Sequence, residues 1–502
     1  MSVVLELDRI TKRFGALVAN DAISLQLAKG ECLALLGENG AGKTTLMNIL
    51  FGHYAADEGA VQVFGKPLPS GRPRAAIDAG VGMVHQHFTL ASNLNVLDNV
   101  ILGSEPLGKV KSDRSGARSK LVELSDTFGL PVDPEARVGA LSVGEKQRVE
   151  ILKALYRDAR ILILDEPTAV LARPEAERLF ETLRGMIKGG LSLIFISHKL
   201  HEVMAASDRV AVLRGGKKVA ERVTADTSPA ELAELMVGHK VARPKRTEAK
   251  QGAPVLVAKN VTVSGAATGL DAASFTVHEG EILGIVGVSG NGQSTLGALL
   301  SGLIRPEAGQ LTLNGAEVAG LGPRGLIAAG AARIPEDRHA QGVVGEMTIW
   351  ENAVLERLGR FTRRGFVKRA AAQAHANHLI ERFDIRGAAP DTRIRLLSGG
   401  NMQKLILGRS LAAAPAFILA NQPTRGLDEG AVAAVHTELL AARDKGAAIL
   451  LISEELEEAV ALADRIQAIV NGKLSQPIAT ETANAQRLGL MMAGMWDAPD
   501  AA

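Results

Sequence analysis

An internal repeat is the feature that most constrains how this 502-residue chain can fold. The segment GENGAGKTT at Gly37–Thr45 returns as GVSGNGQST at Gly287–Thr295, 250 residues later. LSVGEKQ from Leu141 returns as LSGGNMQ from Leu397, and LILDEPT returns as ILANQPT, each 256 residues later. Repeats that stack into solenoids have periods of roughly 20 to 50 residues. The much longer period found here indicates two duplicated domains.

A polar stretch separates the two copies. Residues 239–254, HKVARPKRTEAKQGAP, interrupt the apolar periodicity and gather proline, lysine and arginine, which is typical of a linker. We therefore expect a first domain over residues 1–240, a linker over residues 241–254 and a second domain over residues 255–495.

Each copy is expected to be an α/β domain. In the first copy, short buried strands at Arg160–Glu166 and Leu191–His198 flank the helical pattern PEAERLFETLRGMIKGG. Strands that are apolar on both faces and alternate with helices predict a parallel sheet covered by helices. Residues 87–140 are rich in helix formers and predict an inserted helical subdomain. The second copy has six more residues in the corresponding interval, 337–396.

Composition excludes several classes of protein. A formal net charge of +2 provides no overall positive field that would favour nucleic-acid binding. The single cysteine, Cys32, excludes a disulfide framework or a cysteine-based metal cage, and we expect it to be a small buried hydrophobe. The N-terminal sequence MSVVLELDRITKRF lacks a signal-peptide apolar region, and no apolar run approaches the length of a membrane span. A cytosolic protein without membrane spans is expected.

The first copy contains a phosphate-binding loop. Residues Gly37–Thr44 fit G-x-x-x-x-G-K-[ST] between a predicted strand and a predicted helix. The glycines let backbone N–H groups close around phosphates, and the helix N-terminus adds its dipole. Lys43 can bridge the β- and γ-phosphates of a nucleotide, and Thr44 can bind Mg²⁺.

A pair of carboxylates follows another buried strand of the first copy. Asp165 stands at the predicted strand end, where it can bind Mg²⁺, and Glu166 stands beside it, where it can polarise the attacking water. Alone, such a pair is typical of a helix cap or a solvated loop. With a phosphate-binding loop upstream, the pair indicates a nucleotide-hydrolysing site.

These motifs, together with Gln86, LSVGEKQ or LSGGNMQ, and Ser197–His198, resemble the nucleotide-binding domains of ABC transporters over nearly the whole chain. The resemblance implies two tandem P-loop NTPase domains, each with a parallel-sheet core, an antiparallel β subdomain and an inserted helical subdomain. It also implies ATP and Mg²⁺ as cofactors. By resemblance, Gln86 links Mg²⁺ and water to the membrane partner, His198 contacts the γ-phosphate, and Phe14 stacks on adenine. The residues expected to bind ATP are Phe14, Gly37, Glu38, Asn39, Gly40, Ala41, Gly42, Lys43, Thr44, Thr45, Ser398, Gly399 and Gly400.

The second copy departs from this pattern at its catalytic positions. The residues of the degenerate site are Gln293, Ser294, Glu336, Asn421, Gln422 and Glu454, with Ser142 and Gly144 facing it from the first copy. Gln293 replaces the loop lysine, and Asn421 and Gln422 replace the two carboxylates. Glu454 occupies the position of His198, and Glu336 that of Gln86. Ser264 occupies the position of Phe14. We expect weak nucleotide binding at most in this copy, and no hydrolysis.

The defects fall in one of two composite sites. In the head-to-tail domain pairing that the resemblance implies, the intact loop faces Ser398, Gly399 and Gly400 of the second copy. The degenerate loop faces LSVGE, where Val143 replaces the first glycine and would crowd a close backbone approach. One departure lies in the complete site, because Ala172 stands where an Asp is usual, whereas the second copy keeps Asp428.

Further motifs indicate the branch of the family. Two fused ATPase domains without membrane spans resemble the carbohydrate-uptake branch of bacterial importers. IPEDRHAQGVV, PTRGLD, ANQPT and GVSGNGQS are most similar to the ATPase of nucleoside importers. The resemblance implies membrane permease subunits, indirect contact with an extracytoplasmic solute-binding protein, and a peripheral position on the cytoplasmic face of the inner membrane. It leaves open nucleoside or simple sugar as solute, and pairing within the chain or with a second copy.

Two alternatives account for less of the sequence. A tandem ABC ATPase acting on ribosomes or DNA would keep two intact sites with a long charged linker, or carry zinc-binding cysteines. A P-loop kinase or switch GTPase leaves the repeat and LSGGN unexplained. Trp350, in EMTIWENAV, follows a loop that contacts the permease in this family, and both surface docking and helix packing remain open for it.

Overall fold

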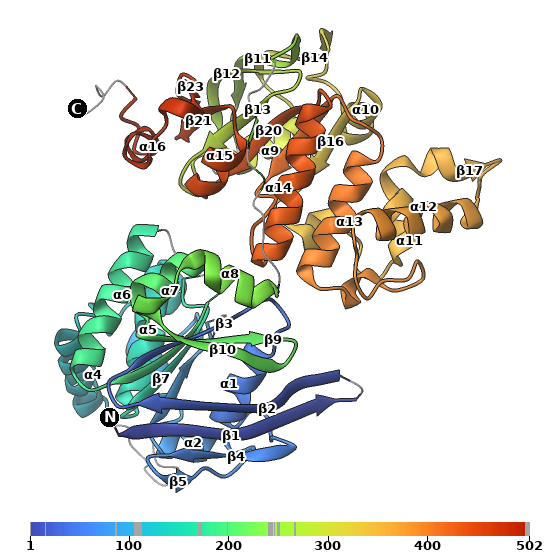
Figure 1. The fold of residues 1–502 in the computed structure, drawn as a ribbon. Helices are drawn as coiled ribbons and strands as arrows, with labels where there is room; N and C mark the ends of the chain where they lie inside the picture. The colour runs from blue at the N-terminus through green and yellow to red at the C-terminus, as the bar shows by residue number, and fades with distance from the viewer. Residues whose placement is uncertain are drawn as a thin grey trace. The chain divides into compact units, whose positions relative to one another are not determined.

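The computed structural model describes residues 2–15, 17–85, 88–104, 113–168, 173–197, 199–238, 244, 246–247, 251–265 and 268–496. The chain divides into two compact units, Met1–Val241 and Ala242–Ala502 (Figure 1). Within the described residues, no helix has the length and apolar character needed to cross a bilayer.

A six-stranded sheet forms the centre of the first unit, in the order β10-β9-β3-β8-β7-β6. All neighbouring strands are parallel except β10, which runs antiparallel to β9. The strands are β3 (Cys32–Gly37), β6 (Val81–Val84), β7 (Ile161–Asp165), β8 (Ser192–Ile196), β9 (Arg209–Arg214) and β10 (Lys217–Val223). The predicted parallel core is confirmed.

Both faces of this sheet are buried, but against different partners. Alternate residues of a strand point to opposite faces, so Leu33 and Leu35 join one core cluster and Ala34 and Leu36 join another. The first cluster includes a separate antiparallel sheet, β2-β1-β4-β5, and the helix that follows β3. Its strands are β1 (Val3–Phe14), β2 (Leu17–Ala28), β4 (Glu58–Val63) and β5 (Lys66–Pro67).

Helices cover the sheet and build the predicted helical subdomain. The α-helices are α1 (Lys43–Phe51), α2 (Pro73–Asp78), α3 (Val96–Ile101), α4 (Arg114–Phe128), α5 (Val143–Tyr156), α6 (Arg173–Lys188), α7 (Leu200–Ala206) and α8 (Pro229–Val237). Short 3₁₀ turns are η1 (Val138–Ala140) and η2 (Thr224–Asp226). The helical subdomain comprises α3, α4 and α5. Cys32 is buried in this unit, as expected, and burial raises the pKa of its thiol.

The second unit repeats this architecture. Its central sheet has the order β16-β19-β20-β13-β21-β22, with β23 paired to β21, and its antiparallel sheet has the order β12-β11-β14-β15. The strands are β11 (Pro254–Val263), β12 (Leu270–His278), β13 (Ile282–Val286), β14 (Ala308–Leu313), β15 (Ala316–Glu317), β16 (Ala331–Ile334), β19 (Phe417–Asn421), β20 (Ala448–Ser453), β21 (Arg465–Val470), β22 (Lys473–Leu474) and β23 (Ile478–Ala479).

Helices cover this second sheet as well. The α-helices are α9 (Gln293–Leu300), α10 (Pro323–Ala328), α11 (Ile349–Val354), α12 (Arg369–Arg382), α13 (Gly399–Leu411), α14 (Glu429–Asp444), α15 (Leu456–Leu462) and α16 (Ala485–Met492). The 3₁₀ turns are η4 (Leu355–Phe361), η5 (Ile394–Leu396) and η6 (Thr480–Thr482). Trp350 on α11 packs, partly buried, against the core, with the Arg369 guanidinium 5.8 Å from its ring centre.

The interval that carries the six extra residues contains two irregular features. A π-helical turn, η3 (Arg338–Gly342), follows Glu336. A two-stranded hairpin, β17 (Thr362–Arg363) and β18 (Phe366–Val367), follows η4. In Figure 1 this hairpin projects from the end of the second unit's helical subdomain, beyond α11 and α12.

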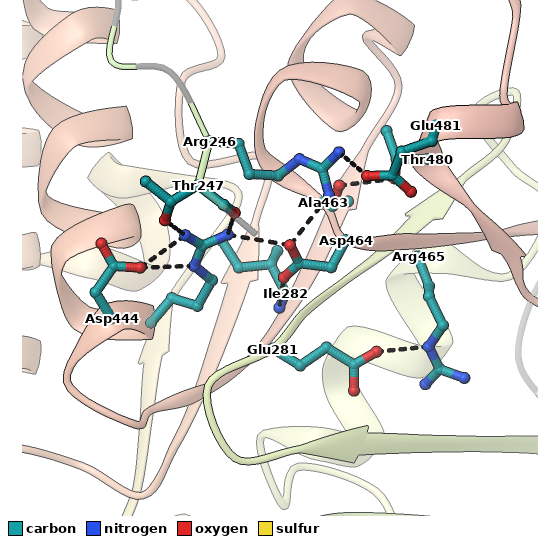
Figure 2. Close-up of polar contacts among 11 residues, drawn as sticks. Arg246, Thr247, Glu281, Ile282, Asp444, Ala463, Asp464, Arg465, Thr480 and Glu481 are labelled. Atoms are coloured by element: carbon teal, nitrogen blue, oxygen red, sulfur yellow. Dashed lines mark hydrogen bonds and ion pairs between the residues drawn. The ribbon is translucent and has the colours of Figure 1, made fainter. Parts of the chain in front are cut away.

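Two residues of the polar stretch between the copies are bound to the second unit. Arg443, whose side chain is 1% exposed, donates to the Thr247 carbonyl oxygen at 3.1 Å and hydroxyl oxygen at 2.6 Å (Figure 2). It also pairs with Asp464 at 3.0 Å, as does Arg246 at 3.1 Å. Burial raises the pKa of Asp464, opposed by the Ile282 amide and the two arginines. This network is a charged anchor for the end of the linker.

Candidate functional site

The phosphate-binding loop of the first unit joins β3 to α1. Gly42 has a φ of +96°, and a side-chain carbon there would lie 2.2 Å from the Ala19 carbonyl oxygen. A side-chain carbon at Gly37 would lie 2.4 Å from the Leu213 carbonyl oxygen. Both positions therefore require glycine. Gly42 caps α1 without a side-chain hydrogen bond, so no cap side chain competes with an anion at this helix N-terminus.

Lys43 is folded over this loop. Its ammonium group is buried and donates to the carbonyl oxygens of Gly37 at 2.7 Å and Glu38 at 2.9 Å. The side chain therefore lies at the inner surface of the loop, where a phosphate bound by the backbone N–H groups would meet its charge. The structure brings together Lys43, Thr44 and the carboxylate at the end of β7, as the sequence predicts.

Asp165 ends β7 and is buried beside the loop. Burial raises its pKa to about 6, and the neighbouring Glu166 carboxylate adds to the rise. A hydrogen bond from the Thr44 hydroxyl and the charge of Lys43 oppose it. A carboxylate that is poorly solvated, with a hydroxyl beside it, is a donor set suited to a divalent cation.

Glu166 occupies a strained backbone position that the sequence did not reveal. Its φ is +47°, in the left-handed region, and its N–H donates to the Ile196 carbonyl oxygen at 3.1 Å. Gln422 in the second unit has the same φ, and its N–H donates to the Ile452 carbonyl oxygen at 2.8 Å. Non-glycine residues are held in this region only when the surrounding structure fixes them. The backbone is thus the same in both units, and only the side-chain chemistry differs.

The buried charge of Asp165 should cost stability. Because its folded-state pKa of about 6 lies above the ordinary 3.8, the folded protein holds a proton more tightly than the unfolded chain. The penalty is therefore absent below the ordinary pKa and fully present above pH 6, up to about 3 kcal/mol at ~1.4 kcal/mol per pKa unit. We expect Asp165→Asn without nucleotide or Mg²⁺ to melt above wild type at pH 8, with a smaller difference at pH 5. Equal melting temperatures at both pH values would contradict this prediction.

A buried glutamate that sequence reasoning missed connects the ends of two strands. Glu202 accepts hydrogen bonds from the hydroxyls of Ser197, at 2.7 Å, and Thr168. In the second unit Glu458 accepts from Ser453 and Thr424, each at 2.6 Å. The signal was available, because all three residues recur at the 256-residue offset even though the catalytic residues do not. This triad fixes the segments that follow β7 and β8, which include Glu166.

Three residues considered in the sequence lie outside the described part of the chain: Gln86, His198 and Ala172. Phe14, at the end of β1, is described. The residue is 44% exposed, and its ring lies edge-on to Tyr54, with ring centres 5.6 Å apart. It therefore presents an aromatic surface to solvent, and Tyr54 is a second aromatic at this place that the sequence did not suggest.

Both signature motifs form helix N-termini. Ser142 caps α5 in a capping box, with its hydroxyl donating to Glu145 at 2.7 Å. Val143, which follows it, is 39% exposed. Ser398 caps α13 by accepting from Asn401, whose side-chain amide lies 3.0 Å from the hydroxyl. Each motif thus lies at the start of a helix, the end at which backbone N–H groups can bind an anion.

The second-unit signature is packed closely at both glycines. A side-chain carbon at Gly399 would lie 3.2 Å from Nε of Arg338, and one at Gly400 would lie 3.1 Å from the Ala431 side chain. Arg338, on the π-helical turn, donates to the carbonyl oxygens of Arg425 at 2.7 Å and Gly426 at 3.3 Å. It therefore connects the PTRGLD segment with the signature, a role the sequence did not suggest.

The second unit's loop is filled by its own side chain. The Gln293 amide donates to the Val288 carbonyl oxygen at 2.9 Å and accepts from the Asn291 N–H at 3.0 Å. Unlike Lys43, Gln293 carries no charge, and its side-chain oxygen already accepts the Asn291 N–H of the loop. Asn421 is buried with its carbonyl oxygen lacking a partner among the described residues. Glu336 forms an ion pair with Arg425.

Comparison with known proteins follows the same division of the chain. A family model described as ABC transporter matches residues 20–169 and 270–425, together more than half of the chain. The guanosine import ATP-binding protein NupO of Bacillus subtilis is 44% identical over 500 residues, 98% of this chain and 98% of its own. The glucose import ATP-binding protein TsgD13 of Haloferax volcanii is 42% identical over 98% of this chain and 96% of its own.

A solved structure of an archaeal ribosome recycling factor, aABCE1, with the ribosomal stalk protein aP1, resembles this chain in fold. The TM-score is 0.65 at 19% identity, over 97% of this chain and 92% of that chain. At this level of identity the similarity concerns the tandem fold alone.

Proposed function

This chain belongs to the ABC transporter family and is an ATP-hydrolysing import subunit, and on that premise we propose that it hydrolyses ATP at one complete composite site to drive uptake of a nucleoside. The observation that carries the one-site proposal is the contrast between Lys43 and Gln293. The first is a cation that donates to two carbonyl oxygens of its loop, and the second is a neutral amide whose oxygen accepts one of its loop's backbone N–H groups.

Each residue of the complete site has a proposed role. Lys43 and the backbone of the loop hold the β- and γ-phosphates of ATP. Glu166 accepts a proton from the attacking water. Gln86 and His198 are proposed to contact the metal-bound water and the γ-phosphate, and Phe14 the adenine. The hydrogen bond from its N–H to β8 holds the backbone of Glu166 in place at the end of β7.

Thr44 and Asp165 fit a Mg²⁺ ion, with Gln86 as a further proposed ligand. When bound, Mg²⁺ would neutralise charge that develops on the phosphate oxygens. A cation here also favours the charged form of Asp165, which burial disfavours in the protein alone. The exposed Thr44 and the buried Asp165 carboxylate are therefore suited to binding a metal ion between them.

The signature of the second domain is proposed to complete the site. Ser398, Gly399 and Gly400 would grip the γ-phosphate from the N-terminus of α13, in a head-to-tail pairing of domains within the chain or between two copies. Ser142 and Gly144 would face the degenerate loop of Gln293 and Ser294. The other residues of that loop's site, Asn421, Gln422 and Glu454, supply neither a carboxylate at the metal position nor a histidine.

Partners and solute follow from the family. We propose membrane permease subunits as direct partners, an extracytoplasmic solute-binding protein as an indirect one, and attachment to the cytoplasmic face of the inner membrane. Nucleoside is favoured over sugar by the IPEDRHAQGVV, PTRGLD and ANQPT motifs and by the NupO relative. The TsgD13 relative makes a simple sugar the second candidate.

The test is ATP-driven uptake in proteoliposomes. The chain would be co-purified with its permease, reconstituted, and supplied with ATP inside and with labelled guanosine, ribose or glucose and the cognate solute-binding protein outside. Uptake of guanosine supports the proposal. Uptake of ribose or glucose without uptake of guanosine would make a simple sugar the solute in place of a nucleoside. Co-purification with ribosomes in place of a permease would overturn the import assignment.

Restoring the loop lysine should not restore a second hydrolytic site. Gln293→Lys returns a charge to the second loop, but Asn421 and Gln422 still provide no carboxylate for metal or water. We expect ATPase activity within about twofold of wild type, since general-base catalysis supplies roughly 10²–10⁴-fold and remains absent there. Trapping of hydrolysed nucleotide at two sites per chain, in this variant or in the native protein, would contradict the one-site proposal.

A further inference from the structure

The segment from Leu355 to Arg369, which we call the basic hairpin, comprises η4, β17, β18 and the two residues that follow. Its sequence, LERLGRFTRRGFVKR, contains six lysine and arginine residues after Glu356. No acidic residue occurs between Glu356 and Glu381. In a chain whose net charge is only +2, this is a local concentration of positive charge.

Four of these cations are exposed and unneutralised. Arg360, Arg363, Arg364 and Lys368 have no ion pair within the described part of the chain, whereas Arg369 pairs with Asp391 at 2.9 Å. Like charges held this close repel one another. Within the described residues no acidic side chain pairs with these four cations, so an external anionic partner would be needed to neutralise their charge.

The turn of the hairpin places one of these cations at its tip. Arg364 and Gly365 have φ values of +51° and +84°, and they join β17 to β18 as a two-residue loop. Such turns favour Asn or Gly at the first position, because other residues are strained in the left-handed region. An isolated hairpin of two-residue strands is also marginal in water. The turn therefore holds Arg364 at the exposed tip of the hairpin.

Apolar side chains are exposed beside the cations. Phe366 is 80% exposed, the highest fraction among the large hydrophobic residues that the structure describes. Val367, Leu355 and Leu358 are each 41% exposed, and η4 buries none of its residues. The hairpin thus combines unpaired cations with an exposed aromatic ring and aliphatic groups.

We propose that the basic hairpin binds the anionic lipid headgroups of the membrane surface, with Phe366 entering the interfacial layer. The proposal rests on the proposed function, which holds the chain at a membrane. Anionic lipid surfaces attract clusters of lysine and arginine, and aromatic and aliphatic side chains enter the boundary between headgroups and acyl chains. A lipid surface offers both complements in one partner. The hairpin would thereby add a contact to the bilayer beside the contact to the permease.

The test is sedimentation of the full chain with vesicles. Vesicles of phosphatidylcholine, with or without phosphatidylglycerol, would be compared at low and at high salt. We expect binding only with phosphatidylglycerol, and weaker binding at high salt because surface charges are screened. Replacing Arg360, Arg363, Arg364 and Lys368 by Gln should lower the partition coefficient by more than about tenfold, since each basic residue near such a surface contributes several-fold.

A matched variant separates the hairpin from overall charge. Exposed cations of the same unit that have no ion pair in the described residues are Lys259, Arg305, Arg324 and Lys445. Replacing these four by Gln removes the same charge and should leave vesicle binding unchanged. If both variants lose vesicle binding equally, the binding depends on net charge and not on the hairpin, and the proposal is overturned. In a Phe366→Trp variant, the emission of the introduced tryptophan should shift to the blue when anionic vesicles are added. The absence of this shift would overturn the insertion of this residue.

A further measurement distinguishes this proposal from the proposed function. In detergent without bilayer, the hairpin variant should still co-purify with the permease and hydrolyse ATP like wild type. Loss of permease binding with unaltered vesicle binding would assign the hairpin to a protein partner and overturn the lipid proposal. If the wild-type chain binds anionic vesicles but neither hydrolyses ATP nor binds a permease, the proposed function fails while the lipid contact stands.

Discussion

Replacing Glu166 by Gln should lower ATP hydrolysis by about 10²–10⁴-fold, the usual cost of losing a general base. The amide keeps the hydrogen-bonding shape, and the left-handed backbone is compatible with it because Gln422 occupies the same conformation in the second unit. ATP should therefore bind and remain intact. The measurement is steady-state phosphate release together with nucleotide retention on the assembled complex.

The second unit offers the matched control for this substitution. Gln422→Ala changes the equivalent position in a site that is proposed not to hydrolyse, so activity should remain within about twofold of wild type. Activity of Glu166→Gln within a few-fold of wild type would remove Glu166 from the proposed mechanism. A large loss in Gln422→Ala would instead place the chemistry in the second unit.

Ser398→Arg should abolish ATP hydrolysis, whereas Ser142→Arg should leave a substantial fraction. In the proposed head-to-tail pairing, Ser398 would face the γ-phosphate bound by Lys43, and a bulky cation there would displace the backbone donors of α13. In the same proposed pairing, Ser142 would face the degenerate loop, for which no hydrolysis is proposed. The expected difference is at least about 10²-fold, as for the loss of an oxyanion donor.

The two substitutions are matched in their effect on folding. Each serine caps a helix, α5 or α13, so each variant loses a cap worth about 0.5–2 kcal/mol. Melting temperature and co-purification with the permease should therefore change similarly, and the ATPase difference reports the site. Equal losses of activity would mean that the sites are not divided as proposed, and a larger loss in Ser142→Arg would reject the head-to-tail pairing.

The sequence predicted those parts of the site that depend on local pattern. The loop residues Gly37–Thr44 and the buried strand before Asp165 were visible because motif and periodicity coincide over a few residues. The left-handed backbone of Glu166 was not visible, because it depends on a hydrogen bond to a strand that is distant in sequence. The internal pairing of Gln293 was likewise hidden, since substitution shows only the loss of charge and not where the amide goes.

The fold, like the site, was predictable where it depends on local sequence pattern. Alternating strands and helices predicted the parallel cores and the helical subdomain, which the structure confirms. The hairpin at 362–367 could not be predicted, because strands of two residues have no periodicity to detect. The attachment of Arg246 and Thr247 was also hidden, since their partners are distant in sequence: Arg443 is 196 residues from Thr247, and Asp464 is 218 residues from Arg246.

The anchor that holds Arg246 and Thr247 decides where the gene can be cut. A recombinant fragment beginning at Val255 would leave Arg443 and Asp464 buried beside each other without the linker groups that complete their hydrogen bonds. Each unmet donor costs about 1–3 kcal/mol, so such a fragment should express as a weakened protein. In the first unit, Ile187 stands where the second has Arg443, so the same demand does not arise there. To express the two domains separately without this loss, the chain should be divided before Pro244. Arg246 and Thr247 then stay with the second domain.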